Sequence, residues 1–303
     1  MTALDAPAAA GAAVRPPRFE SARRFARAFL RRRSGIAGLA VLAAFTVLAL
    51  VAPLFIGPDQ LDVTRVNGPL LASPSAHYPL GTDQAGRSVL LMLIYGSRES
   101  LRVGVIATLL TLVIGSGIGI VAGHYGGLVG RLLMHLTDWF IALPGMPLAI
   151  SLAAVLGQGE TSITIAIAVT SWTGTARLIR AQTLAVEARP FVERARALGA
   201  GHGQIMQRQV LPNVMPLILV SSTLTIAGAM LSEATLTFLG LGDPTSVTWG
   251  EMLNQAFFNG AFTADAWWYI LPPGLAILLV VLGFTLVGRA VETVLDPRMQ
   301  ERP

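Results

Sequence analysis

The chain has 303 residues, of which 53% are hydrophobic and only 13% are charged. Soluble domains carry about 25% charged residues, so this composition, with its long apolar runs, indicates a protein that lies in a lipid bilayer. The formal net charge is +5. The arginines lie beside apolar runs, a placement typical of membrane topology rather than of nucleic-acid binding.

Two residue types are missing from the sequence. There is no cysteine, which excludes disulfides, thiolate metal ligands and thiol nucleophiles. There is also no lysine, since all 22 basic residues are arginine. A phosphate-binding loop places a lysine on the phosphates, so we expect no nucleotide-hydrolysing site in this chain.

The N-terminal region could be a targeting segment or the approach to a membrane helix. Residues 1–20 are rich in alanine and proline, which predicts disorder. Arg23-Arg24 faintly resembles a twin-arginine export signal, but the following apolar run, 36–56, has about 21 residues. The apolar region of a signal peptide has about 7–15 residues, whereas a spanning helix needs about 20. We therefore expect a retained membrane helix.

Six apolar segments are long enough to cross a bilayer. Because lipid offers backbone groups no hydrogen-bond partners, each of them is expected to be a helix. The predicted fold is therefore all-α and polytopic. The six spans are predicted near residues 36–56, 101–122, 133–156, 162–179, 213–235 and 269–288.

The distribution of arginines predicts the orientation of these spans. Eighteen of the 22 arginines fall on one side of the six-span arrangement, and the other side has only Arg65, Arg87, Arg98 and Arg102. Arginine accumulates on the cytoplasmic side of membrane proteins, so both termini are expected in the cytoplasm.

This topology divides the chain into five regions. We expect a cytoplasmic N-terminal arm, a first transmembrane helix, an extracytoplasmic segment, a core of five further transmembrane helices and a cytoplasmic tail. Their respective bounds are 1–35, 36–56, 57–100, 101–290 and 291–303, and the core includes a cytoplasmic coupling segment at 180–212. A second long outer connection, 240–268, carries Trp249, Trp267 and Trp268, which suit a membrane–water boundary.

A row of small residues lies in the second predicted span. Gly115, Gly119, Gly123 and Gly127 recur at four-residue spacing, which lets two helix backbones approach closely in lipid. Gly115, Gly117 and Gly119 together also resemble, weakly, the glycine motif of dinucleotide-binding proteins. No strand precedes it, so helix packing is the favoured interpretation.

The third predicted span contains an acidic residue and a proline. Pro144 removes a backbone donor and is expected to bend the helix. Asp138 precedes Trp139 and is not expected to face lipid, because a charged side chain in lipid is costly. It could be a translocation or gating residue, or it could form an ion pair at the cytoplasmic end with Arg131. We favour the ion pair.

Other polar residues near the spans give weaker signals. Glu233 is expected near the outer face, where contact with a docked partner or an outer gate competes equally with a simple interfacial carboxylate. The histidines share no ligand spacing, so we expect no metal site. They are His77, His124, His135 and His202.

The segment from Arg189 to Asn213 is the most informative. Pro190 suits the first position of a helix, and Glu193 complements the helix dipole there. Phe191, Ala195 and Leu198 form an apolar stripe at helical spacing. Glycines at 199, 201 and 203 end or kink this helix, and a second short helix is predicted at 204–211. The small apolar face favours docking to a protein groove over resting on lipid.

This segment also resembles a known signature. Glu193-Arg194-Ala195, then Gly199, then Val210-Leu211-Pro212 are similar to the cytoplasmic E-A-A loop of binding-protein-dependent ABC importer permeases, whose second position is usually alanine. The resemblance is closest to the C-type permeases of the dipeptide, oligopeptide and nickel group. It covers about residues 80–298, through Gly81-Thr-Asp83, Gly86-Arg87, Ala122–Gly127, Ala176–Arg180, Thr237–Gly242, Trp249-Gly250 and Leu295–Arg298.

The resemblance implies a type I importer permease fold and a set of partners. A second homologous permease would pair with this chain in the bacterial inner membrane, two ABC ATPase subunits would attach in the cytoplasm, and an extracytoplasmic substrate-binding protein would deliver short peptides. ATP and Mg²⁺ would bind to the ATPase subunits, leaving this chain without a cofactor or catalytic residue. The coupling contacts would come from Phe191, Val192, Glu193, Ala195, Leu198, Gly199, Ala200, Gly201 and Pro212.

The sequence evidence for residues of the translocation path is weaker. They are Asp138, Trp139, Pro144, Trp172, Ser222, Thr225 and Glu233. Nickel, glutathione, a metal chelate or another small solute remains open as cargo, because selectivity in such systems resides largely in the binding protein. A self-contained secondary transporter would need intramembrane charges, and the middles of these spans are nearly bare of them.

Overall fold

A computed structural model of the chain describes residues 25–295, and it is helical throughout, with no strand in that range apart from one isolated bridge between Thr82 and Ser88. The alanine- and proline-rich N-terminal segment and the Asp296-Pro297-Arg298 motif lie outside the described residues. The long elements are α2 (Arg33–Phe55), α3 (Val89–Tyr125), α4 (Gly127–Ala142), α5 (Gly145–Leu156), α6 (Glu160–Glu187), α9 (Leu211–Phe238), α10 (Trp249–Phe258) and α11 (Trp267–Leu295).

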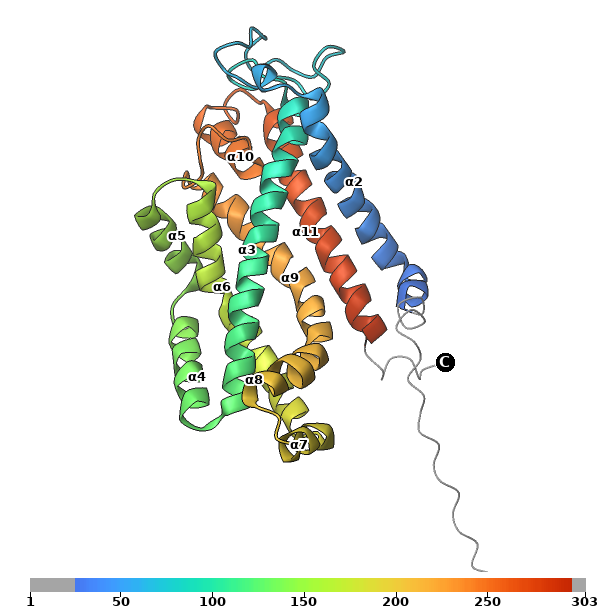
Figure 1. The fold of residues 1–303 in the computed structure, drawn as a ribbon. Coiled ribbons are helices and arrows are strands. Elements are labelled where there is room, and N and C mark those ends of the chain that lie inside the picture. The colour runs from blue at the N-terminus through green and yellow to red at the C-terminus, as the bar shows by residue number, and fades with distance from the viewer. Residues whose placement is uncertain (1–24, 296–303) are drawn as a thin grey trace, which may run out of the picture.

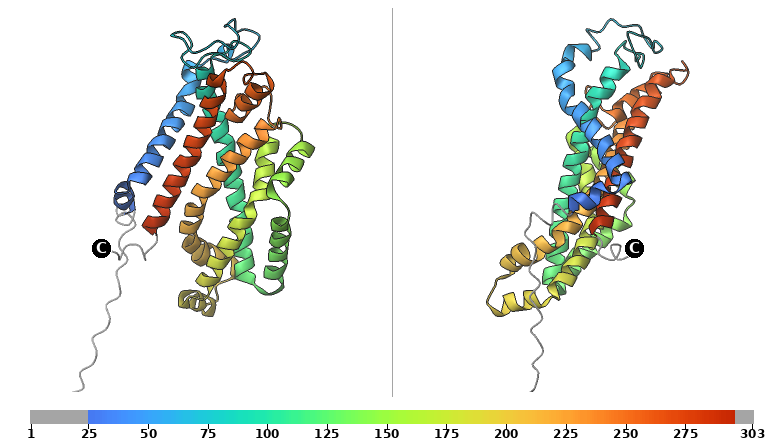
Figure 2. Two further views of the ribbon diagram at one scale, coloured as in Figure 1. Left: turned by 180° about the vertical axis from the view of Figure 1, so that it is seen from behind. Right: turned by 90° about the vertical axis from the view of Figure 1, so that its right-hand side faces the viewer.

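Shorter elements lie between them. These are a 3₁₀ turn, η1 (Pro58–Gln60), the helices α7 (Pro190–Ala197) and α8 (His202–Ile205), and a π turn, η2 (Met206–Val210). Figure 1 shows α10 and the connection before α3 at one end of the bundle and α7 at the other, and we call these the α10 end and the α7 end. α2 and α11 pack side by side, which both views of the bundle's flank confirm (Figures 1 and 2).

Four described helices are long and apolar enough to cross a membrane. They are α2, α3, the run from His202 to Phe238, and α11, and the bent pair α4–α5 would be a fifth. α6 has 28 residues but is less apolar. Hydroxyls such as those of Thr164 and Thr170 donate to carbonyls of their own helix, so they suit a helix that packs on α3. The count of six spans therefore stays a prediction.

The glycine row joins α3 to α6. A Cβ on Gly119 would lie 2.6 Å from the carbonyl oxygen of Ala176, and Gly115 and Gly123 meet α6 just as closely. This confirms the predicted close packing, which side chains larger than hydrogen would prevent. Gly127 does not belong to the row, because it begins α4 and a Cβ there would meet nothing within 4 Å.

The third predicted span is broken rather than continuous. α4 ends at Ala142 and α5 begins at Gly145, with a bend of 91° between them. Pro144 is the N-cap of α5 with extended backbone angles. Since proline has no N–H to donate and its ring clashes with the preceding turn, the expected bend becomes a full break.

Two of the outer tryptophans are core residues instead of boundary residues. Trp249 is completely buried and its indole N–H donates to the carbonyl of Leu93 at 3.0 Å. Trp268 is nearly buried as well, and only Trp267 is exposed. α3 also begins at Val89, before the predicted span, so that Val89 and its neighbours pack into this core.

Candidate functional site

The α7 end carries a helix–turn–helix projection, residues 188–205. Pro190 occupies the first turn of α7 and Glu193 follows in the same turn, as predicted. Gly199 has a φ of +83°, a conformation that glycine adopts without the strain of a side chain. It ends α7 and turns the chain into α8.

The buried face of α7 differs from the predicted stripe. Val192 is completely buried, in one cluster with Val186 of α6, Ile205 of α8 and Val210 of η2. Phe191 packs on that cluster, whereas Leu198 is 88% exposed. Val192 therefore seats the projection on the bundle, and Leu198 is an exposed apolar side chain at its tip.

The remaining predicted coupling residues, apart from Pro212, lie on the same projection. Glu193, Gly199 and Gly201 are exposed, and Ala195 and Ala200 are half-buried. Pro212 is exposed as well, but it lies in the first turn of α9.

The second helix of the projection is not separate from the next span. α8 continues through η2 into α9, and the predicted helix at 204–211 was wrong in this respect. The N–H of Leu211 donates to the carbonyl of Met206, five residues earlier. Pro212 has no N–H to offer, and a widened turn just before it lets the helix continue without a break.

The predicted ion pair of Asp138 exists with a different partner. Its carboxylate accepts from the guanidinium of Arg177 on α6 at 2.6 Å, and both side chains are half exposed. Arg131, the expected partner, instead donates to the carbonyl of Gly127 on its own helix. The pair thus joins α4 to α6.

The other predicted path residues differ in their surroundings. Trp139 and Pro144 are exposed, Ser222 and Thr225 are half-buried, and the two hydroxyls donate within α9. Trp172 is buried against the ring of Phe140. Glu233 is also buried, with the Thr237 hydroxyl 3.3 Å from its carboxylate, so it is not a simple interfacial carboxylate.

Sequence reasoning missed a polar hollow at the α10 end. Its volume is about 1120 Å³, and its walls come from the starts of α3 and α6, the connection after α9, and α10. Arg102 pairs there with Glu99 and Glu160. Glu160 is 58 residues from Arg102 in the sequence, and no local motif marked the hollow.

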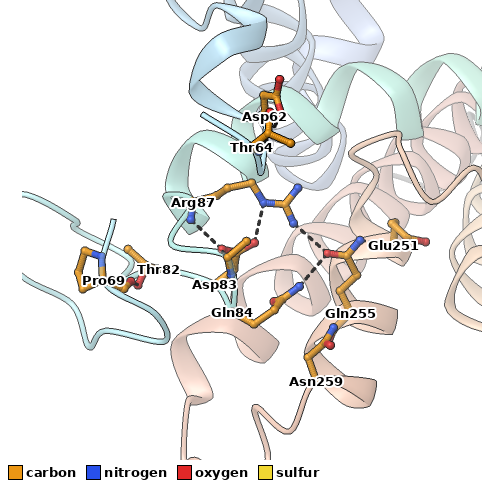
Figure 3. A network of polar contacts seen from close by, with 11 residues as sticks. Asp62, Thr64, Pro69, Thr82, Asp83, Gln84, Arg87, Glu251, Gln255 and Asn259 are labelled. Atoms are coloured by element: carbon orange, nitrogen blue, oxygen red, sulfur yellow. Dashed lines mark hydrogen bonds and ion pairs between the residues drawn. The ribbon is translucent and has the colours of Figure 1, made fainter. Parts of the chain in front are cut away.

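A buried ion pair holds the segment before α3 to α10 (Figure 3). Asp83 accepts from the side chain and the backbone N–H of Arg87, each at 2.7 Å. The side-chain amide oxygen of Gln255 on α10 accepts from Arg87 at 2.8 Å and from Gln84 at 3.0 Å. Burial raises the pKa of the nearby Glu251 carboxyl above its ordinary value.

In the same outer region the pKa of the exposed Asp62 is lowered. The backbone N–H and the hydroxyl of Thr64 both donate to its carboxylate and favour the charged form.

Comparison with known proteins relates these features to two families. Residues 115–301 match the family described as "Binding-protein-dependent transport system inner membrane component". Residues 22–74 match the "N-terminal TM domain of oligopeptide transport permease C".

Individual relatives cover almost the whole chain. It is 35% identical to the dipeptide transport system permease protein DppC of Alkalihalophilus pseudofirmus, over 89% of this chain and 88% of that protein. It is 36% identical to the di/tripeptide permease DppC of Pseudomonas aeruginosa, over 91% and 92%. It is 34% identical to the glutathione permease GsiD of Pectobacterium atrosepticum, over 92% and 91%.

Proposed function

The chain belongs to the inner-membrane components of binding-protein-dependent transport systems, and from this premise we propose that it imports short peptides as one permease subunit of an ABC importer. The observation that carries the proposal is the projection at the α7 end. It is seated on the bundle through Val192 and leaves Leu198 88% exposed. The peptide permeases among its relatives support the cargo.

The proposed assembly contains four further protein subunits. Two ATPase subunits bind on the cytoplasmic side, a second homologous permease pairs with this one, and a substrate-binding protein docks outside. ATP binding draws the two ATPase subunits together and shifts the permease pair between inward-facing and outward-facing states, as expected of a two-state equilibrium biased by ligand. Lipid surrounds the exposed apolar side chains of the spans.

Docking of the ATPase is proposed at the exposed tip of α7. Leu198 would enter a groove of the ATPase, while Arg189, Arg194 and Arg196 give the projection a basic flank. This places the α7 end in the cytoplasm, as the arginine distribution also predicts.

The test is Leu198→Asp in the complete assembly. Placing a carboxylate in an apolar contact carries a desolvation cost, so we expect the ATPase subunits to be lost on purification and ATP-driven peptide uptake in proteoliposomes to fall at least about tenfold. Leu70→Asp, a change at another exposed leucine at the α10 end, is the control and should retain the ATPase subunits. Full retention and uptake by Leu198→Asp would contradict the docking assignment.

Glutathione is the second candidate cargo, because one relative is a glutathione permease. The two candidates are separated by the ligand that co-purifies with the partner binding protein, identified by mass spectrometry. A range of di- and tripeptides supports peptide import, and glutathione alone supports the second candidate.

A further inference from the structure

We propose that Glu187 is a positioning residue of the transport cycle. Its carboxylate ties the projection to the ends of α3 and α6, so that movement of the projection is passed to the membrane helices. The inference rests on the proposed function, since it takes the projection to be where the ATPase binds.

The two oxygens of Glu187 have different partners. One oxygen contacts Nδ1 of His124, and the other contacts the guanidinium of Arg196. Nε2 of His124 in turn lies 2.9 Å from Nδ1 of His202. The Glu187 side chain is only 10% exposed, and that of His124 is completely buried.

The chemistry of these groups determines which atoms donate and which accept in the network. A carboxylate accepts hydrogen bonds, so Nδ1 of His124 carries the proton that Glu187 receives. With its proton on Nδ1, the His124 ring offers Nε2 as an acceptor, and Nε2 accepts a hydrogen bond from the Nδ1–H of His202. The bond from the Arg196 guanidinium to the Glu187 carboxylate joins two charged groups, which makes it stronger than a hydrogen bond between neutral groups.

Four elements meet in this network, α8 through the contact of His202 with His124. Glu187 is the last residue of α6, His124 lies in the last turn of α3, Arg196 lies in the last turn of α7, and His202 is the first residue of α8. The sequence separations are 63 residues between His124 and Glu187 and 78 between His124 and His202. Both arms of the projection are therefore linked to both membrane helices.

The membrane helices are locked to each other one turn from the network. A Cβ on Gly123 would lie 2.7 Å from the Cβ of Thr183, so α3 and α6 are in close backbone contact there. The apolar packing of Val192 is non-directional and does not by itself fix the rotation of α7. The directional bond from Arg196 to Glu187 fixes that rotation, and the bond from His124 holds the same carboxylate to α3, so the carboxylate sets how motion is transmitted.

The first test measures coupling in the complete assembly in proteoliposomes. Glu187→Ala removes both contacts, and Glu187→Gln keeps the size of the side chain but offers a single acceptor. We expect peptides imported per ATP hydrolysed to fall at least about fivefold in the alanine variant and by less in the glutamine variant, a range typical of lost coupling between sites. The KM for ATP should be unchanged. Glu292→Gln, at an exposed carboxylate of α11, is the matched control.

The second test observes the projection directly and needs no ATPase. The chain has no cysteine, so Ala197→Cys gives a single site for a spin label on the exposed tip of α7. In the purified permease, Glu187→Gln is expected to increase the mobility of this label, whereas Glu292→Gln leaves it unchanged.

Three outcomes separate this inference from the docking proposal. If the import-to-ATP ratio of Glu187→Ala matches that of the unsubstituted protein, the positioning role is wrong, and unchanged label mobility in Glu187→Gln would show that the carboxylate does not hold the projection. If Leu198→Asp keeps its ATPase subunits, the docking proposal fails, and the label measurement still tests the contact made by Glu187. Loss of the ATPases in Leu198→Asp together with normal coupling in Glu187→Ala would overturn the present inference alone.

Discussion

A few buried charged residues organise the hydrogen bonds at each end of this bundle. At the α10 end, Asp83 is completely buried and the Arg87 side chain is 8% exposed, and the pair is completed by hydrogen bonds from the backbone and to Gln255. Asp59 and Arg65 form a similar pair in the same region, but both of their side chains are more than half exposed. Burial rather than charge decides which pair matters, because water screens the exposed one.

Removing one partner of the buried pair should therefore be costly. Asp83→Asn leaves the Arg87 charge buried without its counterion, and we expect the free energy of unfolding to fall by about 3 kcal/mol. Asp59→Asn should change it by less than about 1 kcal/mol. Chemical unfolding of the purified permease in detergent, followed by tryptophan fluorescence, measures both. Equal effects of the two substitutions would show that burial does not control the energetics here.

At the scale of elements, the packing of α3 on α6 depends on the absence of side chains along one face. Gly119 faces the backbone of α6, and Gly117, two residues earlier on the same helix, faces open space. Without water between helices, close backbone approach contributes much of the association in a membrane. The two glycines therefore offer a comparison in which helix propensity is the same and only the packing differs.

Alanine at these two positions should separate packing from propensity. In Gly119→Ala the new Cβ would lie 2.6 Å from the Ala176 carbonyl oxygen, so the helices must shift, at a cost of about 1–3 kcal/mol. Gly117→Ala should be neutral or slightly stabilising. Thermal unfolding of the two purified variants measures the difference. A smaller loss for Gly119→Ala than for Gly117→Ala would be incompatible with this helix interface.

At the scale of the whole molecule, the described chain begins and ends toward the same side. α2 starts and α11 finishes toward the α7 end, while α10 and the long connection before α3 gather at the opposite end (Figures 1 and 2). The chain from the start of α2 to the end of α11 must therefore cross the membrane an even number of times. The broken pair α4–α5 counts as one crossing. This arrangement agrees with the arginine distribution, which predicts that the α7 end lies in the cytoplasm.

Orientation can be measured because the natural chain has no cysteine. We expect Ala76→Cys, in the connection before α3, to react with a membrane-impermeant maleimide added to intact cells. Glu292→Cys, near the end of α11, should react only after the membrane is opened. Both positions are exposed, so their reactivity reports the side of the membrane. The reverse labelling pattern would invert the proposed topology.

The sequence alone was sufficient for the features that depend on local pattern. Long apolar runs required helices in lipid, the glycines of α3 predicted a close helix contact, and Pro190 with Gly199 bounded the projection. These signals work because a proline, a glycine or a helical period constrains its own few residues, whatever the rest of the chain does. The motifs of the coupling segment also pointed to the family.

The pairings between distant side chains came only with the folded chain. Asp138 pairs with Arg177, 39 residues away, rather than with Arg131. Glu187 contacts His124, which contacts His202, and the sequence spacing of these two histidines gave no sign of the contact. Local period does not encode how helices are placed against one another, and a buried polar group takes whichever partner the packing brings within reach. For the same reason, Val192 proved to be the seat of the projection and Leu198 its exposed tip.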